Sequence, residues 1–374
     1  MKRTLLWVII AIVALTPLMA GCGSKECDFR IGLVTDVGEV DDKSFNEAAW
    51  NATKQAADEL KLSEDCRGYI ETQDAKDYIP NVDSFVSEGV KVIVTSGFAM
   101  AQATNDAAKK YPDVFFIGTD QWYNEQLPNL AGLVFNEDQS GFLAGALAAL
   151  MSKSGIVGGV YGTDVVPPVV YFREGYENGA KYINPNIKTL GAYHPGGLAT
   201  GFTDPQWGGE TAATMMDQGA DVIFGAGGPT GSGGIQGAAQ TGAWVIGVDQ
   251  DEYLTTFKNG AAAGADKLLS SAMKRVDNSV YGAIKSAVDG TFEGGTVLFE
   301  AANDGVGLAD FHEADSAIPA DVKTRLQEIA AGLKDGSIKT GVTLGEPAPA
   351  AEDAVASIDP SGQEILFWHA STKT

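Results

Sequence analysis

Short apolar runs alternate with helix-like segments along most of the chain, and this alternation restricts the fold more than any other feature of the sequence. Strands that alternate with helices are typical of βαβ units, in which the strands lie parallel. The strands read as continuous apolar runs, as expected where helices cover both faces of a sheet. The predicted strands are Phe29–Thr35, Gly68–Thr72, Lys91–Thr95, Val114–Gly118, Ala131–Phe135, Gly155–Tyr161, Asp221–Ala226 and Trp244–Val248. The predicted helices are Ser44–Leu60, Asp77–Glu88, Ala99–Lys110, Gln139–Met151, Arg173–Ile183, Gly208–Gln218 and Gly231–Gln240.

The pattern repeats in two halves that meet near residue 138, in a chain of 374 residues that is long enough for two domains. The sequence therefore predicts an α/β fold of two doubly wound parallel-sheet lobes, joined by a hinge, with a cleft between them. We expect lobe 1 to contain residues 27–137 plus about 275–297, and lobe 2 to contain residues 138–274 plus about 298–344. The hinge strands are expected near Phe135–Asn136, Leu269–Lys274 and Val297–Ala301.

The N-terminal residues have the features of an export signal. Lys2 and Arg3 precede an apolar run that ends in Leu18-Met19-Ala20-Gly21-Cys22. This ending resembles a bacterial lipobox, so we expect a signal peptide over residues 1–21 and a lipid on Cys22, at the outer face of the cell membrane. A plain signal peptide and an N-terminal membrane anchor are the alternatives.

The net charge of −23 argues against general binding to nucleic acid or to anionic lipid surfaces. Loss of Lys2 and Arg3 with the signal peptide would make it −25. Beyond Cys22, the chain has only Cys27 and Cys66, which precede the first two predicted strands. Because such strand starts lie side by side in a parallel sheet, a disulfide between them is one expectation, and two buried thiols are the other. No zinc-like cysteine spacing is present, and we predict no metal site and no cofactor.

The C-terminal residues 345–374 depart from the alternating pattern. They begin with a stretch rich in Pro, Ala and acidic residues, which is typical of a linker. The chain then ends in a short apolar segment that could form a disordered tail or an added edge strand.

Ligands of doubly wound folds bind outside the carboxyl ends of the strands, so the residues that follow each strand are the candidate site. After the first strand, Ser44 and Glu47 fit a helix capping box. A capping box does not explain Phe45 and Asn46, which would lie at the rim of the cleft together with Asp36. Further candidates at strand ends are Ser96, Gly97, Phe98, Asp120, Asp249 and Lys274, the last of which is expected to begin a helix turn.

Catalytic motifs are not evident. The turn Gly225–Gly234 lacks the ending of a Walker loop, although its amides could still face a ligand. There is no G-x-S-x-G motif, and surface positions are expected for His194, His312 and His369. These observations favour binding over catalysis.

Several segments carry a specific family resemblance, and together they span about residues 30–341. They include VTDVGEVDDKSFNEAAW, NEDQSGFLAGALAALMSKSGIVGGV, VVYFREGYENGAKYINP, GFTDPQWGG, DVIFGAGGPTG, VIGVDQDEY and LLSSAMKRVD. In these segments the chain resembles the basic membrane protein family of lipoproteins, of the purine nucleoside receptor type. Members of this family are substrate-binding components of ABC importers.

The resemblance implies a periplasmic-binding-protein fold of type I that closes on a nucleoside and then meets a membrane permease. Base contacts and one stacking ring would come from Asp36, Asn46 and Phe45, with Asp42 as a further candidate in the same segment. The ribose would be held by Asp249 and Lys274, and by Asp120 as an additional acid. The resemblance further assigns Gly227 and Gly228 to the glycine-rich turn, and either Phe172 or Phe202 to the second stacking face.

The charge balance of the candidate residues favours an uncharged ligand. Asp36, Asp42, Asp120 and Asp249 would face Lys274 almost alone, so a phosphate would be repelled. We therefore expect a nucleoside rather than a nucleotide. The alternatives are a pentose or other furanose-like ligand, an enzyme such as a nucleoside hydrolase, and a surface antigen without a ligand.

Overall fold

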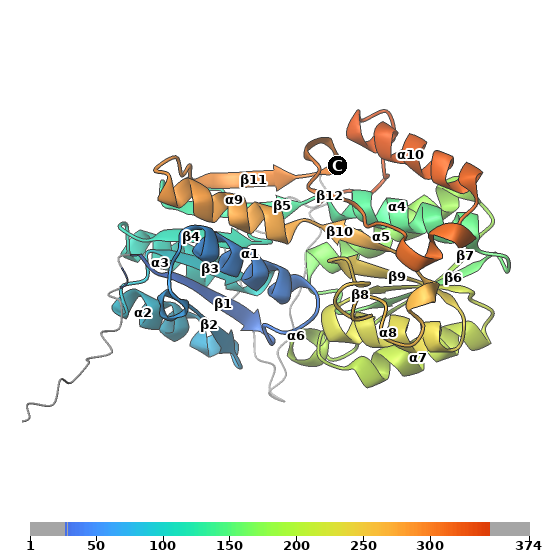
Figure 1. Cartoon of the computed structure of the whole chain (residues 1–374), viewed down its shortest axis with the longest axis horizontal. Coiled ribbons are helices and arrows are strands. Elements are labelled where there is room, and N and C mark those ends of the chain that lie inside the picture. Colours follow the sequence, from blue (N-terminus) through green and yellow to red (C-terminus); the bar gives the residue numbers. More distant parts are fainter. Residues whose placement is uncertain (1–26, 28, 345–374) are drawn as a thin grey trace, which may run out of the picture.

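The protein, described here by a computed structural model that covers residue 27 and residues 29–344, consists of two α/β lobes side by side (Figure 1). The predicted fold class is confirmed by this architecture and by its structural relatives. Each lobe contains a six-stranded sheet, and the two sheets have the same arrangement of successive strands.

Lobe 1 is built on the sheet with the strand order β11-β5-β4-β3-β1-β2, in which every pairing is parallel. Its strands are β1 (Ile31–Val37), β2 (Arg67–Thr72), β3 (Val92–Ser96), β4 (Phe115–Thr119), β5 (Leu130–Phe135) and β11 (Gly295–Phe299). Its helices are α1 (Phe45–Glu59), α2 (Tyr78–Ser87), α3 (Ala101–Lys110) and α9 (Val276–Val288). Helices α1 and α9 pack on each other, and α2 and α3 do the same.

Lobe 2 is built on the sheet with the order β12-β10-β9-β8-β6-β7, and only β12 runs antiparallel to its neighbour. Its strands are β6 (Ile156–Tyr161), β7 (Lys188–Tyr193), β8 (Val222–Ala226), β9 (Trp244–Asp249), β10 (Leu268–Lys274) and β12 (Val306–Leu308). Its helices are α4 (Glu137–Met151), α5 (Pro167–Ile183), α6 (Gly197–Thr200), α7 (Pro205–Asp217), α8 (Gly228–Gln240) and α10 (Ala320–Lys334).

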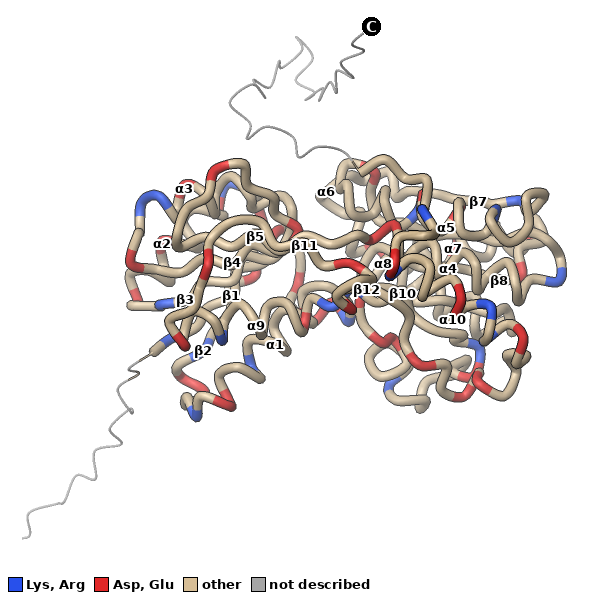
Figure 2. Tube along the Cα trace, turned by 90° about the horizontal axis from the view of Figure 1, so that it is seen from above, with Lys and Arg blue, Asp and Glu red and all other residues tan. Residues whose placement is uncertain are grey.

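Within residues 29–344, the chain passes between the sheets three times, after β5, after β10 and after β11. The three connections are joined by backbone hydrogen bonds. Asn136 N–H donates to the carbonyl of Phe299 over 2.9 Å, and Arg275 N–H donates to the carbonyl of Gly305 over 2.9 Å. Figure 2 shows the narrow junction that results and several acidic positions beside it.

Five elements are absent from the predicted strands, hinge strands and helices: β7, β12, α6, α9 and α10. Strand β7 lies at the edge of its sheet and is partly exposed along its length, so KTLGAY lacks the continuous apolar run used to find the other strands. The helices α9 and α10 lie beyond the last βα repeat that the pattern revealed. The predicted boundaries of the remaining elements differ from the observed ones by a few residues.

The helices α4 and α5 pack unusually closely, and this contact fixes the start of α4 beside the cleft. A Cβ atom at Gly145 would lie 1.9 Å from the carbonyl oxygen of Tyr176, and one at Gly179 would lie 2.0 Å from the carbonyl oxygen of Phe142. Such distances are possible only without a side chain. Glycine on both helices therefore sets the separation of α4 and α5.

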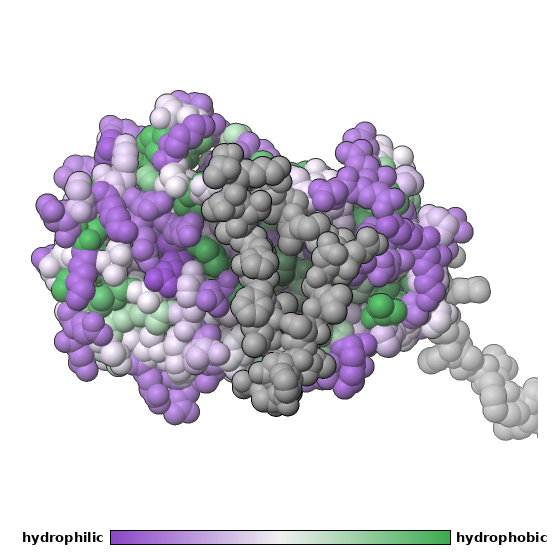
Figure 3. Space-filling model, turned by 180° about the vertical axis from the view of Figure 1, so that it is seen from behind, coloured by the Kyte–Doolittle hydropathy of each residue, from purple (hydrophilic) through white to green (hydrophobic). Residues whose placement is uncertain are grey.

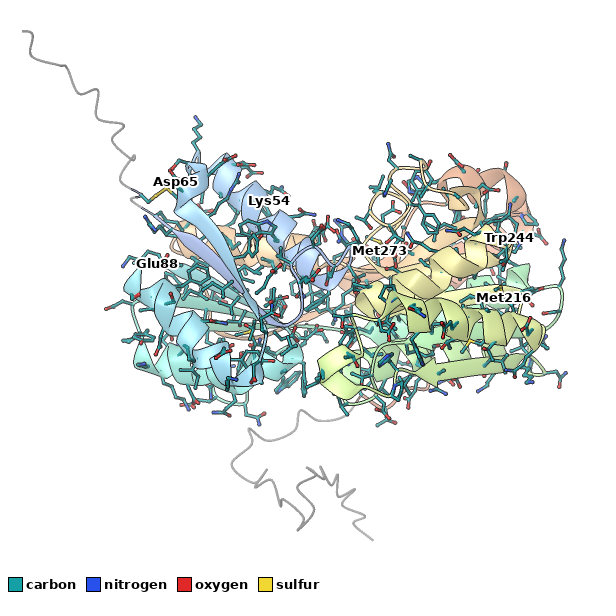
Figure 4. All side chains as sticks on the ribbon, turned by 90° about the horizontal axis from the view of Figure 1, so that it is seen from below. Lys54, Asp65, Glu88, Met216, Trp244 and Met273 are labelled. Carbon is teal, nitrogen blue, oxygen red and sulfur yellow. A yellow bond between two sulfur atoms is a disulfide. The ribbon has the colours of Figure 1, made fainter. Side chains whose placement is uncertain are left out.

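Cys27 and Cys66 are joined by a disulfide, which ties the segment before β1 to the start of β2. Figure 4 shows the bond beside Asp65, at the outer end of lobe 1 and away from Met273 at the junction. The lipobox with Cys22 and the tail at residues 345–374 lie outside the described residues.

The visible back of the molecule is mainly hydrophilic, with scattered apolar side chains on both lobes (Figure 3). Within residues 29–344, no helix combines the length and the apolar character needed to cross a bilayer.

Candidate functional site

A cavity of about 310 Å³ lies between the two lobes, within the size range of small-molecule sites. Its walls contain every predicted ligand residue except Ser96. Lobe 1 contributes Asp36, Asp42, Phe45, Asn46, Gly97, Phe98 and Asp120, and lobe 2 contributes Phe172, Phe202, Gly227, Gly228, Asp249 and Lys274.

Strand ends bring these side chains together. Asp120 directly follows β4, and Asp249 is the last residue of β9, the strand that occupies the same place in the other sheet. Both aspartates have a left-handed backbone, with φ of 60° and 63°. Each lies within the pattern Ile-Gly-x-Asp-Gln, at Ile117–Gln121 and Ile246–Gln250. The two lobes thus present equivalent acids to the cavity from opposite sides.

Lys274 lies between these acids and is almost fully buried. Its Nζ is 2.6 Å from Oδ1 of Asp120 and 2.8 Å from Oε1 of Glu137, and it lies over the rings of Phe45 and Phe135. Lys274 is the last residue of β10, so the predicted helix turn at this position is wrong. Glu137 is not among the predicted site residues, although it begins a helix shortly after a predicted strand.

The pKa values of these groups reflect burial of several acids around one lysine. Burial, with Asp120 and Asp42 nearby, raises the pKa of Asp36 to about 8, so its carboxyl is mainly neutral at pH 7. Burial also raises the pKa of Glu137 to about 7, against the opposing effect of Lys274. Burial alone would lower the pKa of Lys274, but Asp120, Glu137 and Asp249 together raise it, so the ammonium remains charged.

The start of α1 is capped by Asp42, and the predicted Ser44–Glu47 capping box is wrong. The carboxylate of Asp42 accepts hydrogen bonds from the backbone N–H groups of Ser44, Asn46 and Glu47 over 2.8, 2.9 and 3.0 Å. Ser44 makes no side-chain cap bond. Burial raises the pKa of Asp42 to about 7, although the three N–H donors act in the opposite direction. Asp42 lines the cavity, but its oxygens already serve the helix.

Asn46 is held in place by two contacts within lobe 1. Its Oδ1 accepts from the hydroxyl of Ser96 over 2.8 Å, and its Nδ2 donates to the carbonyl of Glu39 over 3.1 Å. Ser96 is fully buried behind Asn46, which explains why it does not reach the cavity. Ser96 thus supports Asn46.

The aromatic residues differ in how freely they face the cavity. Phe45, Phe98 and Phe202 are half-buried, whereas Phe172 is 3% exposed and makes an edge contact with Phe224 in the core of lobe 2. Phe202 lies over Gly162, where a Cβ atom would come within 2.6 Å of its ring. Phe45 and Phe202 therefore present rings from opposite lobes.

Within residues 29–344, the two histidines His194 and His312 make separate local contacts. His194 is buried, so its expected surface position is wrong; it accepts from Gly196 N–H and packs edge-on against Trp207. His312 contacts Asp251 and stacks on Tyr253, and His369 lies outside the described residues. No cluster of potential metal ligands is found among residues 29–344.

The fold and the cleft define a bilobal solute-binding protein. A family profile described as "ABC transporter substrate-binding protein PnrA-like" matches residues 30–337. The protein belongs to this family, which confirms the resemblance seen in the sequence. Because the family consists of substrate-binding components of ABC transporters that catalyse no reaction, the expectation of binding rather than catalysis is also confirmed.

Individual relatives agree with the family assignment. The chain is 30% identical to the ABC transporter nucleoside-binding protein BmpA of Lactococcus lactis, over 90% of this chain and 99% of that protein. It is 31% identical to a lipoprotein of Pyrococcus horikoshii, over 83% of this chain and 78% of that protein. A solute-binding protein of an ABC transporter from Aeropyrum pernix superposes with a TM-score of 0.72 at 26% identity, covering 83% of this chain and 92% of that one.

Proposed function

We propose that the protein binds an uncharged purine nucleoside in its interlobe cavity and delivers it to an ABC permease. One observation carries the proposal: the cavity has aromatic walls from both lobes and, beside them, the acids Asp120 and Asp249 around Lys274. Aromatic faces suit a flat base, and carboxylates accept hydrogen bonds from a ribose diol. The name of the Lactococcus relative supports the same ligand class.

The second stacking ring is proposed to be Phe202 rather than Phe172. Phe202 is half-buried at the cavity, whereas Phe172 is held in the core by Phe224. The base would then lie between Phe45 of lobe 1 and Phe202 of lobe 2. Asn46 and Asp36 would contact its edge, because both line the cavity on the side of Phe45.

The charge of the cavity supports a neutral ligand. Among the described residues that line the cavity, Lys274 is the only basic one, and both Asp120 and Glu137 already compensate its charge. A phosphate would add negative charge beside these acids and find no free cation there. We therefore expect a nucleoside monophosphate to bind much more weakly than the nucleoside.

Ligand binding would favour the closed arrangement by contacting both lobes, with rotation at the three chain connections. Calorimetry with adenosine, guanosine, inosine, ribose and AMP tests the ligand class. We expect binding of at least one purine nucleoside and weak or no binding of ribose and AMP. Tight binding of ribose without binding of any nucleoside would overturn the proposal.

The roles of individual residues are tested by Asp249→Asn, which should weaken nucleoside binding at least about tenfold, since a charged acceptor is lost. Asp113→Asn is the matched control, because Asp113 is exposed in a turn before β4 and lies outside the cavity wall. Equal affinity of the two variants would exclude the proposed ribose contact.

We further propose that the protein is attached to the outer face of the membrane through a lipid on Cys22. The lipobox, the disulfide and the lipoprotein relative support this location. Metabolic labelling with a palmitate analogue should mark the wild type but not Cys22→Ala. Label that persists on the variant would contradict the anchor.

A further inference from the structure

Glu137 is a buried acid at the junction of the lobes that the proposed ligand contacts do not include. It is the first residue of α4 and is 2% exposed, and it is not among the residues of the cavity wall. Its Oε1 lies 2.8 Å from Nζ of Lys274. Burial of a carboxylate costs free energy unless it is paired, and Lys274 provides that pairing. The pairing alone does not explain what function Glu137 has at this position.

The two carboxylates on Lys274 come from different sides of the hinge. Lys274 ends β10 of lobe 2, and α4, which begins at Glu137, packs against β10. Asp120 follows β4 of lobe 1. When the lobes rotate apart, Asp120 moves away from Lys274, whereas Glu137 stays with the lobe that carries Lys274.

The hydrogen-bonding capacity of Lys274 is limited to three N–H groups. Asp120 and Glu137 take two of them in this structure. The third is available to the cavity that Lys274 lines. The rings of Phe45 and Phe135, at 4.9 and 5.0 Å from Nζ, further confine the ammonium.

Without Glu137, an open protein would leave the ammonium with Asp249 as its nearest remaining acid. Asp249 is one of the charges that act on Lys274, and it lines the same cavity. A direct pair between them would occupy the acceptor proposed to receive the ribose hydroxyls. A carboxylate of lobe 2 that stays 2.8 Å from Nζ of Lys274 would remove the need for such a pair.

We propose that Glu137 is a positioning residue that holds the ammonium of Lys274 at the wall of lobe 2 in the open protein. One N–H then points to a ligand hydroxyl oxygen, and Asp249 remains able to accept from the ligand. This inference rests on the proposed function, since it requires a ligand that carries hydroxyl groups. It assigns Glu137 no direct ligand contact.

The test compares Glu137→Gln with the wild type by calorimetry, using inosine, 2′-deoxyinosine, 3′-deoxyinosine, adenosine and its two deoxy forms. Glutamine keeps the shape of the side chain but loses the charge. Loss of one charge-assisted hydrogen bond should weaken binding of the ribonucleosides about tenfold. For the deoxynucleoside that lacks the hydroxyl facing Lys274, the loss should shrink to less than about twofold. Glu300→Gln is the matched control, because this acid lies at the neighbouring chain connection and contacts Asn136 rather than Lys274.

A purely structural role for Glu137 would weaken all these ligands by the same factor, and that result would overturn the inference, as would unchanged binding of every ligand. If Glu137→Gln shows no cooperative thermal transition, Glu137→Asp replaces it under the same criterion, because it keeps the charge but retracts it. If the wild type binds none of the nucleosides, the proposed function fails. If it binds them but shows no dependence on the hydroxyl, only the role of Glu137 fails.

Discussion

The hydroxyl of Ser44 donates to Oδ2 of Asp249 over 2.6 Å, which joins the start of α1 in lobe 1 to the end of β9 in lobe 2. Two neighbouring contacts support this bond across the junction. The side-chain Nε2 of Gln250 donates to the carbonyl of Ser44 over 2.7 Å, and the hydroxyl of Thr255 donates to the carbonyl of Lys43 over 3.1 Å. The lobes are therefore held together directly, beside the ligand cavity.

Ser44→Ala should shift the protein toward its open form. Loss of a buried bond to a carboxylate costs about 1–3 kcal/mol, so we expect roughly tenfold weaker nucleoside binding, mainly through faster dissociation. Stopped-flow fluorescence and small-angle scattering of the unliganded protein measure the two effects. Ser87→Ala is the control, since Ser87 is exposed and its hydroxyl donates to the carbonyl of Ser84 within α2. Identical dissociation rates for Ser44→Ala and wild type would contradict the expected role.

Asp42→Ala should reduce stability through loss of the cap on α1. A lost N-cap costs about 0.5–2 kcal/mol of unfolding free energy, and Asp42 serves three backbone donors. Denaturant unfolding measures this cost. Glu47→Ala should cost less than about 0.5 kcal/mol, because its side chain does not complete a capping box. Equal losses of unfolding free energy for the two variants would contradict the role of Asp42 and favour a capping box formed by Ser44 and Glu47.

Stability should decrease as pH rises from about 5 to 8.5. The pKa of Asp36 is about 8 in the folded protein and 3.8 ordinarily, so between these values the folded state holds a proton that the unfolded state has lost. The stability that the protonated Asp36 contributes is therefore fully present below pH 3.8 and is lost as the pH rises through about 8. For this one group, the unfolding free energy falls by no more than about 1.4 kcal/mol per pH unit. Asp42 and Glu137 act in the same direction, with pKa values of about 7.

The contribution of Asp36 to this pH dependence is isolated by Asp36→Asn. Melting temperatures across the same pH range should fall less steeply for this variant than for wild type, because asparagine does not titrate. Asp113→Asn, at an exposed position, should retain the wild-type slope. Parallel curves for Asp36→Asn and wild type would contradict the assignment.

Gly97→Ala should disturb the ligand site through Asp36. A Cβ atom at this position would lie 1.9 Å from Oδ2 of Asp36, and the backbone φ of 115° is unfavourable for alanine. We expect at least about tenfold weaker nucleoside binding, which corresponds to 1.4 kcal/mol. Gly282→Ala provides the control, because a Cβ atom there meets nothing within 4 Å. If Gly97→Ala binds the nucleoside as tightly as the wild type, the observed position of the Asp36 side chain is not required for binding.

Removal of the disulfide by the double change Cys27→Ser and Cys66→Ser should lower the unfolding free energy by about 2–4 kcal/mol. The bond closes a separation of 39 residues, and the unfolded chain gains freedom when it is absent. Nucleoside affinity should change less than twofold, because the bond lies at the end of lobe 1 opposite the cavity. Denaturation curves of wild type that coincide with and without reductant would contradict this expectation.

Much of the cavity could be predicted because its residues follow strands that are evident in the sequence. Asp36, Asp120 and Asp249 come directly after apolar runs, and the topology of parallel sheets brings such positions to one edge. Glu137 could not be found in this way. It begins a helix, and its importance arises only because Lys274 of a distant strand reaches it.

Predictions from local sequence patterns were wrong where a tertiary contact competed with the local one. Ser44 and Glu47 have the spacing of a capping box, but Asp42 takes the backbone donors, and the hydroxyl of Ser44 turns to Asp249 some 205 positions away along the chain. His194 lies in a turn rich in Gly and Pro, yet Trp207 and the backbone of Gly196 bury it. In both cases the deciding partner was distant or outside the motif.

The sequence by itself determined the alternation of strands and helices, the division into two lobes and the family, because each of these depends on local apolar patterns and on extended matching segments. Only the tertiary structure decided how the acids share one lysine, which ring faces the cavity freely, and which contacts join the lobes. Those outcomes depend on distances between side chains on separate strands and on their burial. A linear order of residues does not specify either quantity.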